Sequence, residues 1–185
     1  MLYMYLHNII GLLDFFLRGC CVFYPFFYPI GAYSIVSAAP TGKDITALQA
    51  ALILVLFMSG WVMTRGANMQ KFFFRLDPES KSFLFGLIKQ KTIPGTRILC
   101  SGWWGLSRHL NYFGEIIQGF ALALPGVLMA PTVYYGAIPL LYPLYYVALF
   151  IPRQIDDDAL CKKKYGAKWD EYCKAVPYRI VPGVW

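Results

Sequence analysis

The chain has 185 residues, of which 58% are hydrophobic, 18% aromatic and only 15% charged. A soluble domain carries about 25% charged residues, so this composition excludes a disordered chain, a coiled coil and an ordinary soluble enzyme. The net charge of +7 comes mainly from two segments, residues 65–97 and 153–179, which hold 14 of the 17 basic residues. Such clusters beside apolar spans are typical of the cytosolic loops of membrane proteins, not of a nucleic-acid surface. We therefore expect a membrane protein in contact with lipid, and no nucleic-acid partner.

The first forty residues are apolar but contain Asp14, Arg18, Pro25 and Pro29, so we predict one broken span or two short segments there. They lack the basic start of a secretory signal peptide, and we expect no cleaved leader. The segment 47–64 (ALQAALILVLFMSGWVMT) is free of charge. Because a span needs about 20 apolar residues, this segment predicts a membrane helix.

A second charge-free run, residues 116–152, has 37 residues and is too long for one membrane span. Pro125 and Pro131 lie near its middle. Because proline interrupts a helix, the run predicts a helical hairpin with one helix over residues 112–129 and the return helix over residues 132–151.

The segment after Asp156 alternates lysines with apolar and aromatic residues at nearly helical spacing. This pattern predicts a basic amphipathic helix on the cytosolic face of the membrane, followed by an extended tail. The expected fold class is an all-α, polytopic membrane helical bundle with about four to five apolar segments. We expect a single membrane domain over residues 1–185, in which residues 1–64 form the amino-terminal spans.

The five cysteines are an odd number and include no C-x-x-C pair. The two histidines, His7 and His109, lie far apart in the chain. Structural metal sites need such ligands at close, regular spacings. We therefore expect neither a disulfide framework nor a bound metal.

The segment 102–115 (GWWGLSRHLNYFGE) concentrates polar and ionisable residues directly before an apolar span. Such groups are costly at the mouth of a membrane helix and usually mark a functional site. The alternative is an interfacial aromatic belt with one snorkelling arginine. We favour a site, because a belt needs neither Asn111 nor Glu115. The other polar residues of the segment are Arg108, His109 and Tyr112.

Two further groups carry charge. Lys71 and Arg75 are four residues apart and share one helix face, where they suit either a phosphate or an anchor at the membrane edge; spacing alone favours the anchor. Asp157 and Tyr165 belong to a charged string and lie eight residues apart, so both could face one cavity, although a solvated charge run fits equally well. No G-x-G-x-x-G motif occurs, so a nucleotide would be held by side chains from several helices.

Together these segments resemble the carboxyl-terminal half of the sterol reductase family. That family includes the sterol C-14, 7-dehydrocholesterol and C-24(28) reductases and the reductase-like domain of the lamin B receptor. The resemblance runs from about residue 65 to the end of the chain, and PFFYPIGAY (25–33) matches a further family block more weakly. The blocks that carry it are RGANMQKFFFR (65–75), LCSGWWGLSRHLNYFGE (99–115) and CKKKYGAKWDEYCKAVPYRIVPGVW (161–185).

The resemblance implies a multi-pass enzyme of the endoplasmic reticulum membrane that reduces a sterol carbon–carbon double bond with NADPH, in sterol biosynthesis. The middle block, the LALPG segment and the VPYRIVP tail look most like the C-14 reductases. Residues 65–185 would be the NADPH-binding half, with Asp157 and Tyr165 as proton donors. The cofactor-binding residues that it implies are Lys71, Arg75, Leu99, Trp104, Asn111, Tyr112, Asp157, Cys161, Lys162, Lys163, Lys164, Tyr165 and Tyr172.

This chemistry suits the residues. An isolated alkene is a poor hydride acceptor, so an acid must protonate one carbon before hydride reaches its neighbour, and a neutral carboxyl or a tyrosine fits that step. The chain departs from the family pattern at RGCCVFY (18–24), in place of an acidic, glycine-rich motif, and at Asp156, in place of an arginine. The family is also longer, so we expect this chain to correspond to its carboxyl-terminal portion, without part of the sterol cavity.

Two other interpretations remain. A methyltransferase of the isoprenylcysteine carboxyl type shares the R-H-x-x-Y-x-G block and the apolar hairpin but binds S-adenosylmethionine, a donor without phosphate that would not need Lys71 and Arg75. An inactive truncated paralogue or membrane scaffold is the third interpretation, against which the presence of Asn111, Asp157 and Tyr165 argues. The sequence leaves the oligomeric state open.

Overall fold

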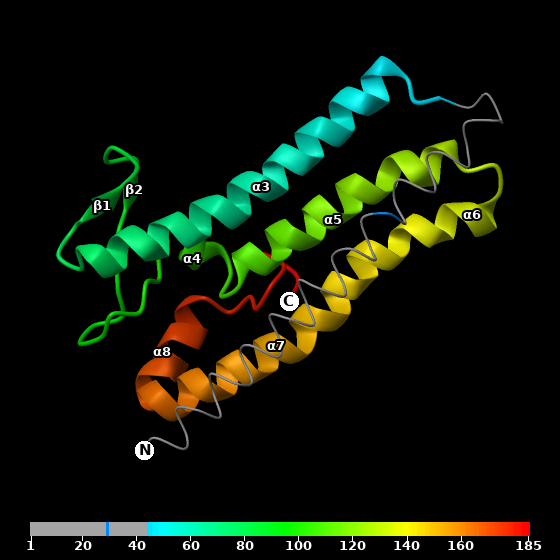
Figure 1. Cartoon of the computed structure of the whole chain (residues 1–185). Helices are drawn as coiled ribbons and strands as arrows, with labels where there is room; N and C mark the ends of the chain where they lie inside the picture. Colours follow the sequence, from blue (N-terminus) through cyan, green and yellow to red (C-terminus); the bar gives the residue numbers. More distant parts are fainter. Residues whose placement is uncertain (1–28, 30–43) are drawn as a thin grey trace. The chain divides into compact units, whose positions relative to one another are not determined.

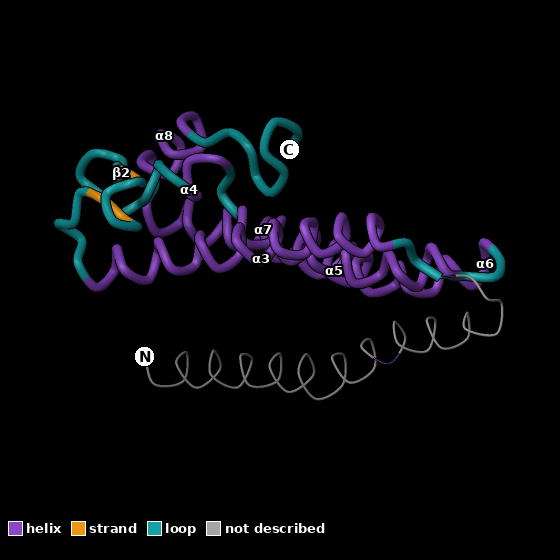
Figure 2. Tube along the Cα trace, turned by 90° about the horizontal axis from the view of Figure 1, so that it is seen from above, coloured by secondary structure: helices purple, strands orange, loops and turns teal. Residues whose placement is uncertain are grey.

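The computed structural model of the chain describes residue 29 and residues 44–185 (Figure 1). The segments predicted within the first forty residues, and the blocks at 18–24 and 25–33, lie outside the described residues apart from Pro29. Helix and loop make up the described part, with one pair of very short strands (Figure 2). In chain order the elements are α3 (Ala47–Leu76), β1 (Ser82–Phe83), β2 (Ile88–Lys89), α4 (Trp103–Leu106), α5 (Leu110–Met129), α6 (Val133–Ala137), the 3₁₀ helix η3 (Ile138–Leu140), α7 (Leu141–Tyr165) and α8 (Ala167–Ala175).

Three stretches of the described chain are long and apolar enough to cross a membrane: Ala47–Leu76, Leu110–Met129 and Val133–Tyr165. A helix satisfies its backbone hydrogen bonds within itself, which is what a segment in lipid requires. The predicted all-α membrane fold is therefore confirmed for these residues. Pro125 and Pro152 lie inside α5 and α7. Membrane helices tolerate such prolines when neighbouring groups satisfy the freed carbonyls.

The helices are longer than the sequence predicts. The helix predicted over residues 47–64 continues to Leu76, so Lys71 and Arg75 belong to the same helix as the apolar span. The return helix predicted over residues 132–151 begins as two short pieces, α6 and η3, and then runs as α7 to Tyr165. Charged residues do not break helical hydrogen bonding, so α7 continues through them. The helix ends just before Gly166, whose φ of 57° suits glycine. The predicted amphipathic helix is thus divided between the end of α7 and α8.

The chain divides into two compact units. One consists of residues 1–50 and 122–142, and the other of residues 51–121 and 143–185. Every candidate site residue belongs to the second unit, which is therefore described by itself below.

Small residues allow α3 and α5 to approach closely within the second unit. A Cβ atom added to Gly60 would lie 2.6 Å from the carbonyl oxygen of Gly114, and one added to Gly114 would collide with the side chain of Thr64. The Thr64 hydroxyl also donates a hydrogen bond of 3.1 Å to the carbonyl oxygen of Asn111. Small residues and an interhelical hydrogen bond are the usual means of close helix packing in membranes. They set the start of α5 against the middle of α3.

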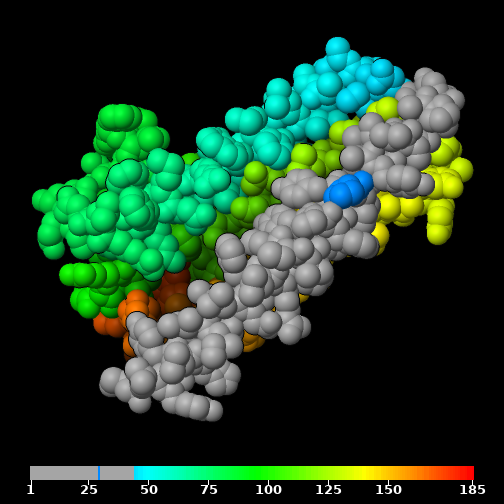
Figure 3. Space-filling view, in the orientation of Figure 1, coloured from blue at the N-terminus to red at the C-terminus, as the bar shows by residue number. Residues whose placement is uncertain are grey.

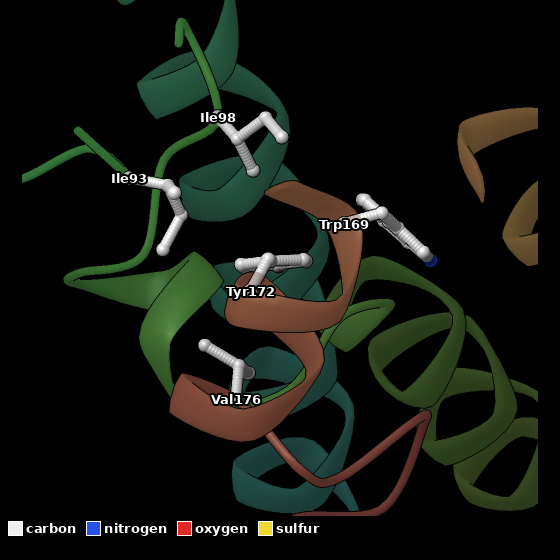
Figure 4. Close-up of a cluster of buried hydrophobic side chains, with 5 residues drawn as sticks. All are labelled: Ile93, Ile98, Trp169, Tyr172 and Val176. Atoms are coloured by element: carbon white, nitrogen blue, oxygen red, sulfur yellow. The ribbon is translucent and has the colours of Figure 1, made fainter. Parts of the chain in front are cut away.

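Helix α8 packs against the loop that precedes α4. Figure 4 shows Ile93 and Ile98 on this loop, with Tyr172 of α8 and Val176, the residue after α8, packed against them. The loop is closed on itself by a bridge between Thr92 and Leu99. These four side chains are almost fully buried, so the contact between them is stabilised mainly by the hydrophobic effect.

The carboxyl-terminal tail completes the amino-terminal end of α5. The backbone N–H of Arg108 donates to the carbonyl oxygen of Tyr178 at 3.0 Å, and that of His109 donates to the carbonyl oxygen of Arg179 at 2.8 Å. The N–H groups around a helix start have no partner within the helix, so the tail supplies the acceptors they need. The tail therefore holds the polar segment 107–112 in place.

Candidate functional site

The loop before α4 is attached to α3 by side chains that are buried. Gln70 is fully buried; its Nε2 donates to the carbonyl oxygen of Ser101 at 3.1 Å, and its Oε1 accepts from the backbone N–H of Trp103 at 3.0 Å. The indole N–H of Trp104 donates to the carbonyl oxygen of Ala67 at 2.8 Å. Leu99 and Trp104 thus join a buried cluster with residues of α3. Both are predicted cofactor residues, and their role in the fold is to hold this loop to α3.

Lys71 lies beside this loop. Its ammonium group is 4.6 Å from the centre of the Trp104 ring, within the range of a cation–π interaction. It also interacts electrostatically with Arg75 on its own helix and with Asp157 and Cys161 of α7. The structure therefore brings predicted cofactor residues from α3, the α4 loop and α7 to one place, although they are separated by up to ninety residues in the chain.

Asp157 connects α7 to the start of α5. The hydroxyl of Tyr112 donates a hydrogen bond of 2.8 Å to Oδ2 of Asp157. The guanidinium Nε of Arg153, one helical turn earlier, is 3.4 Å from Oδ1 of the same carboxyl group. The Tyr112 ring is stacked between His109 and Phe150, with ring centres 4.9 Å and 4.4 Å away. These two stacks leave the phenol little freedom, so its hydroxyl is held at Asp157.

Tyr165 lies two turns beyond Asp157, at the end of α7. Its ring stacks on Trp169 of α8 at 6.4 Å and packs against the cluster that holds α8 to the loop. The ammonium group of Lys164 is 5.0 Å from the centre of the same ring. Tyr165 therefore stands where α7 turns into α8, with a cation beside it.

The lysines at the end of α7 surround this corner. Lys162 forms an ion pair with Asp170 of α8, and Cys161 packs partly buried against the α8 cluster. The hydroxyl of Tyr172 donates to the carbonyl oxygen of Trp104 at 3.3 Å. Burial raises the pKa of Tyr172, so its phenol is protonated at neutral pH and keeps this donor. Lys163 completes the run and is exposed.

A second polar network lies behind Asp157, and the sequence indicated only part of it. The buried guanidinium of Arg108 is 3.6 Å from Oδ2 of Asp158, and that of Arg179 is 3.9 Å from the same oxygen. Gln154 donates to this oxygen at 2.6 Å, and Arg108 also donates to the sulfur of Cys173. Arg108 was among the polar residues of segment 102–115, but no pattern singled out Gln154 or Arg179. Helix spacing offered one signal, because Gln154 lies one turn before Asp158.

Several buried polar atoms at the start of α5 and in the network around Asp158 have no hydrogen-bond partner in the part of the chain that the structure describes. Buried polar atoms normally have a partner in protein, water or ligand. Their grouping therefore indicates a place where water or a polar ligand binds. The atoms are Ser107 Oγ, Arg108 Nε, His109 Nε2, Asn111 Oδ1, Gln154 Oε1 and Asp158 Oδ1.

His109 is neutral at this place. Burial lowers the pKa of His109 to about 4, and the nearby cations Arg108, Lys71 and Arg153 act in the same direction, while Asp157 opposes them. At neutral pH its imidazole therefore has one donor and one acceptor nitrogen.

Among residues 29 and 44–185 no group of three or more histidine, cysteine, aspartate or glutamate side chains is placed to hold a metal ion. Cys100, Cys161 and Cys173 are free thiols. Burial raises the pKa of Cys100, which lies outside the membrane-spanning stretches. A raised pKa keeps this thiol protonated and unreactive.

Several apolar helices, with a cluster of cations, tyrosines and aspartates at one end of a span, define a polytopic membrane protein with a polar site. The family to which it belongs follows from comparison with known proteins. The chain matches the ergosterol biosynthesis ERG4/ERG24 family over residues 10–185 and belongs to that family. The resemblance to sterol reductases is thereby confirmed.

Curated relatives agree with this assignment. The chain is 39% identical to the delta(14)-sterol reductase TM7SF2 of Mus musculus, over 90% of the chain and 38% of that protein. It is 39% identical to the delta(14)-sterol reductase erg24 of Schizosaccharomyces pombe, over 90% of the chain and 37% of the relative. The delta(14)-sterol reductase of Methylotuvimicrobium alcaliphilum is 36% identical over 90% of the chain and 37% of its own length. The chain thus spans a little more than a third of the length of these relatives.

Proposed function

We propose that this protein acts in sterol biosynthesis as an NADPH-dependent sterol reductase of the endoplasmic reticulum membrane, with the C-14 double bond of a sterol as its substrate. The names of the relatives support the reaction and the bond reduced. The observation on which the proposal chiefly depends is the hydrogen bond from Tyr112 to Asp157, a carboxyl group that also interacts electrostatically with Lys71. This arrangement combines a pair of groups that can carry a proton with a cation that suits a phosphate group.

The residues present fit NADPH. Lys71 and Arg75 are exposed cations on one face of α3, and Lys163 and Lys164 are exposed cations at the end of α7. Point charges of this kind suit the phosphates of a dinucleotide. Asn111 Oδ1 is buried without a partner among the described residues and would accept a hydrogen bond from the cofactor. The remaining candidates for cofactor contact are Leu99, Trp104, Tyr112, Asp157, Cys161, Lys162, Tyr165 and Tyr172. When bound, NADPH would supply the hydride of the reaction.

The chain's own residues would supply the proton. Reduction of a carbon–carbon double bond adds one proton and one hydride, and the proton must come from a group next to the alkene. We assign this role to Asp157 and Tyr165. Tyr112, held by its two ring stacks, keeps the Asp157 carboxyl at a fixed position and has a proton of its own to share with it. Positioning of this kind is a large part of catalytic power.

The first test is cofactor binding by the detergent-purified chain, with NADH and S-adenosylmethionine as comparators. Tighter binding of NADPH than of NADH is the expected result, because the extra phosphate of NADPH gives the cations more to bind. Conversion of a C-14-unsaturated sterol is then followed by mass spectrometry. Binding of S-adenosylmethionine alone would replace the proposal with the methyltransferase interpretation. Binding of none of the three would point to a protein without catalytic function.

A further inference from the structure

The hairpin that follows α3 has an apolar tip. Strands β1 and β2 pair in antiparallel register, Phe83 with Ile88, and the turn between them contains Leu84, Phe85 and Leu87. Phe85 is completely exposed and Leu87 is 79% exposed. Adjacent large apolar side chains on a surface usually mark a contact with a partner or a membrane.

The backbone of the turn holds these side chains outward at some cost. Leu84 and Phe85 have φ angles of 54° and 53°, in the left-handed region that large residues seldom adopt. A two-stranded hairpin of this length is only marginally stable alone. Its support is α3, because the rings of Phe83 and Phe73 lie 6.0 Å apart. The hairpin therefore presents its tip from a fixed position beside the end of α3 (Figures 1 and 3).

Exposed apolar side chains also occur along α3, the helix that precedes the hairpin. They form one group up to Val62 and a second group from Met69 to Leu76, with the exposed Arg65 between the two. The members within the second unit are Leu52, Leu54, Val55, Met58, Trp61, Val62, Met69, Phe72, Phe73 and Leu76. Exposed apolar side chains on a helix that crosses the membrane are suited to contact with lipid.

The length of α3 is enough to carry the hairpin beyond the hydrocarbon core of a membrane. Thirty residues at 1.5 Å each give a helix of about 45 Å. A bilayer is about 40–45 Å thick when its headgroups are included. The charge-free part of α3 ends at Thr64, so its last turns, up to Leu76, extend beyond the hydrocarbon core, and β1 begins six residues later.

The base of the hairpin is basic. Lys81 and Lys89 lie at the outer ends of the strands and Lys91 follows β2, and all three side chains are exposed. An apolar tip above a basic base is the distribution found in segments that bind the interface of anionic membranes. The positive-inside rule also predicts that the segments rich in basic residues lie on the cytosolic side, where the leaflet is anionic.

We propose that the hairpin tip, formed by Leu84, Phe85 and Leu87, inserts into the interface of the anionic cytosolic leaflet, and that Lys81, Lys89 and Lys91 contact the headgroups. The occupant of this apolar surface is lipid. The contact fixes the depth of the end of α3, and with it the depth of Lys71. The inference does not depend on the proposed reduction of a sterol.

A fluorinated probe tests the insertion in the full chain. Phe85 is replaced by 4-trifluoromethylphenylalanine, which keeps the ring, and the chain is placed in nanodiscs of phosphatidylcholine with phosphatidylserine. The ¹⁹F relaxation is measured with a doxyl-labelled phospholipid and with a water-soluble gadolinium chelate. The same probe at Glu79, an exposed residue just before the hairpin, is the matched control. We expect the doxyl lipid to enhance the ¹⁹F relaxation more than the chelate does at position 85, and the chelate to enhance it more at position 79.

The lysines are tested in the same experiment. In the double variant Lys81→Glu with Lys89→Glu, the doxyl effect at position 85 should be severalfold smaller than in the wild type in anionic discs. In discs of phosphatidylcholine alone, the doxyl effect of the variant and of the wild type should be similar. A chelate effect at position 85 equal to that at position 79 would place the tip in water and overturn the proposal. Protection from both agents would overturn it in favour of a covering protein segment or a second copy of the chain. An unchanged doxyl effect in the double variant would refute the headgroup contact.

Discussion

The hydroxyl of Tyr112 and the carboxyl of Asp157 are joined by a hydrogen bond of 2.8 Å, although 45 residues separate them in the chain. Tyr112 stands in the first turn of α5 and Asp157 in the last third of α7. The bond therefore ties the polar segment before α5 to the charged end of α7. Because both partners belong to the proposed site, it is the first contact to test.

Removal of the Tyr112 hydroxyl should reduce activity far more than stability. Tyr112→Phe keeps both ring stacks and deletes one hydrogen bond, whose net contribution to folding is about 1 kcal/mol. If the hydroxyl positions or shares the proton of Asp157, kcat should fall about a hundredfold. Turnover of a C-14-unsaturated sterol and thermal unfolding measure the two effects. Tyr134→Phe, on an exposed tyrosine of α6, is the control, and an equal loss in that variant would contradict a specific role for Tyr112.

The proton donors are tested by two isosteric changes. Asp157→Asn and Tyr165→Phe should each abolish sterol reduction, a loss of about a hundredfold or more, while the Kd for NADPH changes little. The neighbouring Asp156→Asn, on an exposed residue of α7, should leave both quantities unaltered. Turnover that survives in one of the first two variants would remove that residue from the acid role.

Lys71 should distinguish the two nicotinamide cofactors. Lys71→Ala removes one charged hydrogen-bond donor, so NADPH binding should weaken by about tenfold or more, while NADH, with one phosphate fewer, loses less. Lys71→Arg should retain most of the affinity. Lys174→Ala, at the end of α8, is the matched control for loss of a charge. Equal losses for the two cofactors would mean that Lys71 does not recognise the additional phosphate of NADPH.

The buried and exposed ion pairs should differ in their contribution to stability. Arg108→Met leaves Asp158 with Arg179 and Gln154 as its partners among the described residues, and loss of one partner from a buried pair costs about 3–5 kcal/mol. The exposed pair between Lys162 and Asp170 should contribute about 0–1 kcal/mol, so Lys162→Ala should change unfolding little.

Thermal unfolding of the two variants in the same detergent measures this difference. A double-mutant cycle of Arg108→Met with Asp158→Asn isolates the interaction between the two side chains. A small shift in Arg108→Met, similar to that of Lys162→Ala, would show that the polar network behind Asp157 is not structural.

His109 should make stability depend on pH. Its pKa is about 4 in the folded chain and 6.5 as the reference value, so the unfolded state takes up a proton first as the pH falls. The contribution of His109 to the free energy of unfolding is fully present above pH 6.5. It is lost as the pH falls toward 4, and the loss is at most about 3 kcal/mol.

The measurement compares the thermal unfolding of the wild type and of His109→Asn between pH 7 and pH 4. Carboxyl groups titrate in both proteins, so the difference between the two curves reports His109. The wild type should lose stability more steeply than the variant as the pH falls. Parallel curves would show that the imidazole is accessible to water and carries a normal pKa.

The sequence was sufficient where the physical cause is local. Low charge and long apolar runs indicate membrane helices, because a helix is the structure that satisfies its own backbone in lipid. The hairpin helix over residues 112–129 was predicted within two residues of α5, Leu110–Met129. Charge was a poor guide to helix ends, however. Helix α3 ends at Leu76 and α7 ends at Tyr165, both well inside charged segments, because helical hydrogen bonds do not depend on side-chain charge.

The site was partly visible for the same reason. Segment 102–115 stood out because polar groups beside an apolar span are costly, and the resemblance to the family implied roles for Lys71, Asp157 and Tyr165. Gln154 and Arg179 had no such signal, since each is an ordinary residue until the fold gives it a buried partner.

The sequence by itself therefore determined that this is a helical membrane protein of the ERG4/ERG24 family, which residues belong to its polar segments, and which of them share a helix face. Only the tertiary structure decided that Tyr112 meets Asp157, that Arg108 meets Asp158, and that an apolar hairpin tip stands at the end of α3. These contacts join residues far apart in the chain. They depend on how the small residues of α3 and α5 pack and on how the loop, α8 and the tail dock, and no local pattern contains that information.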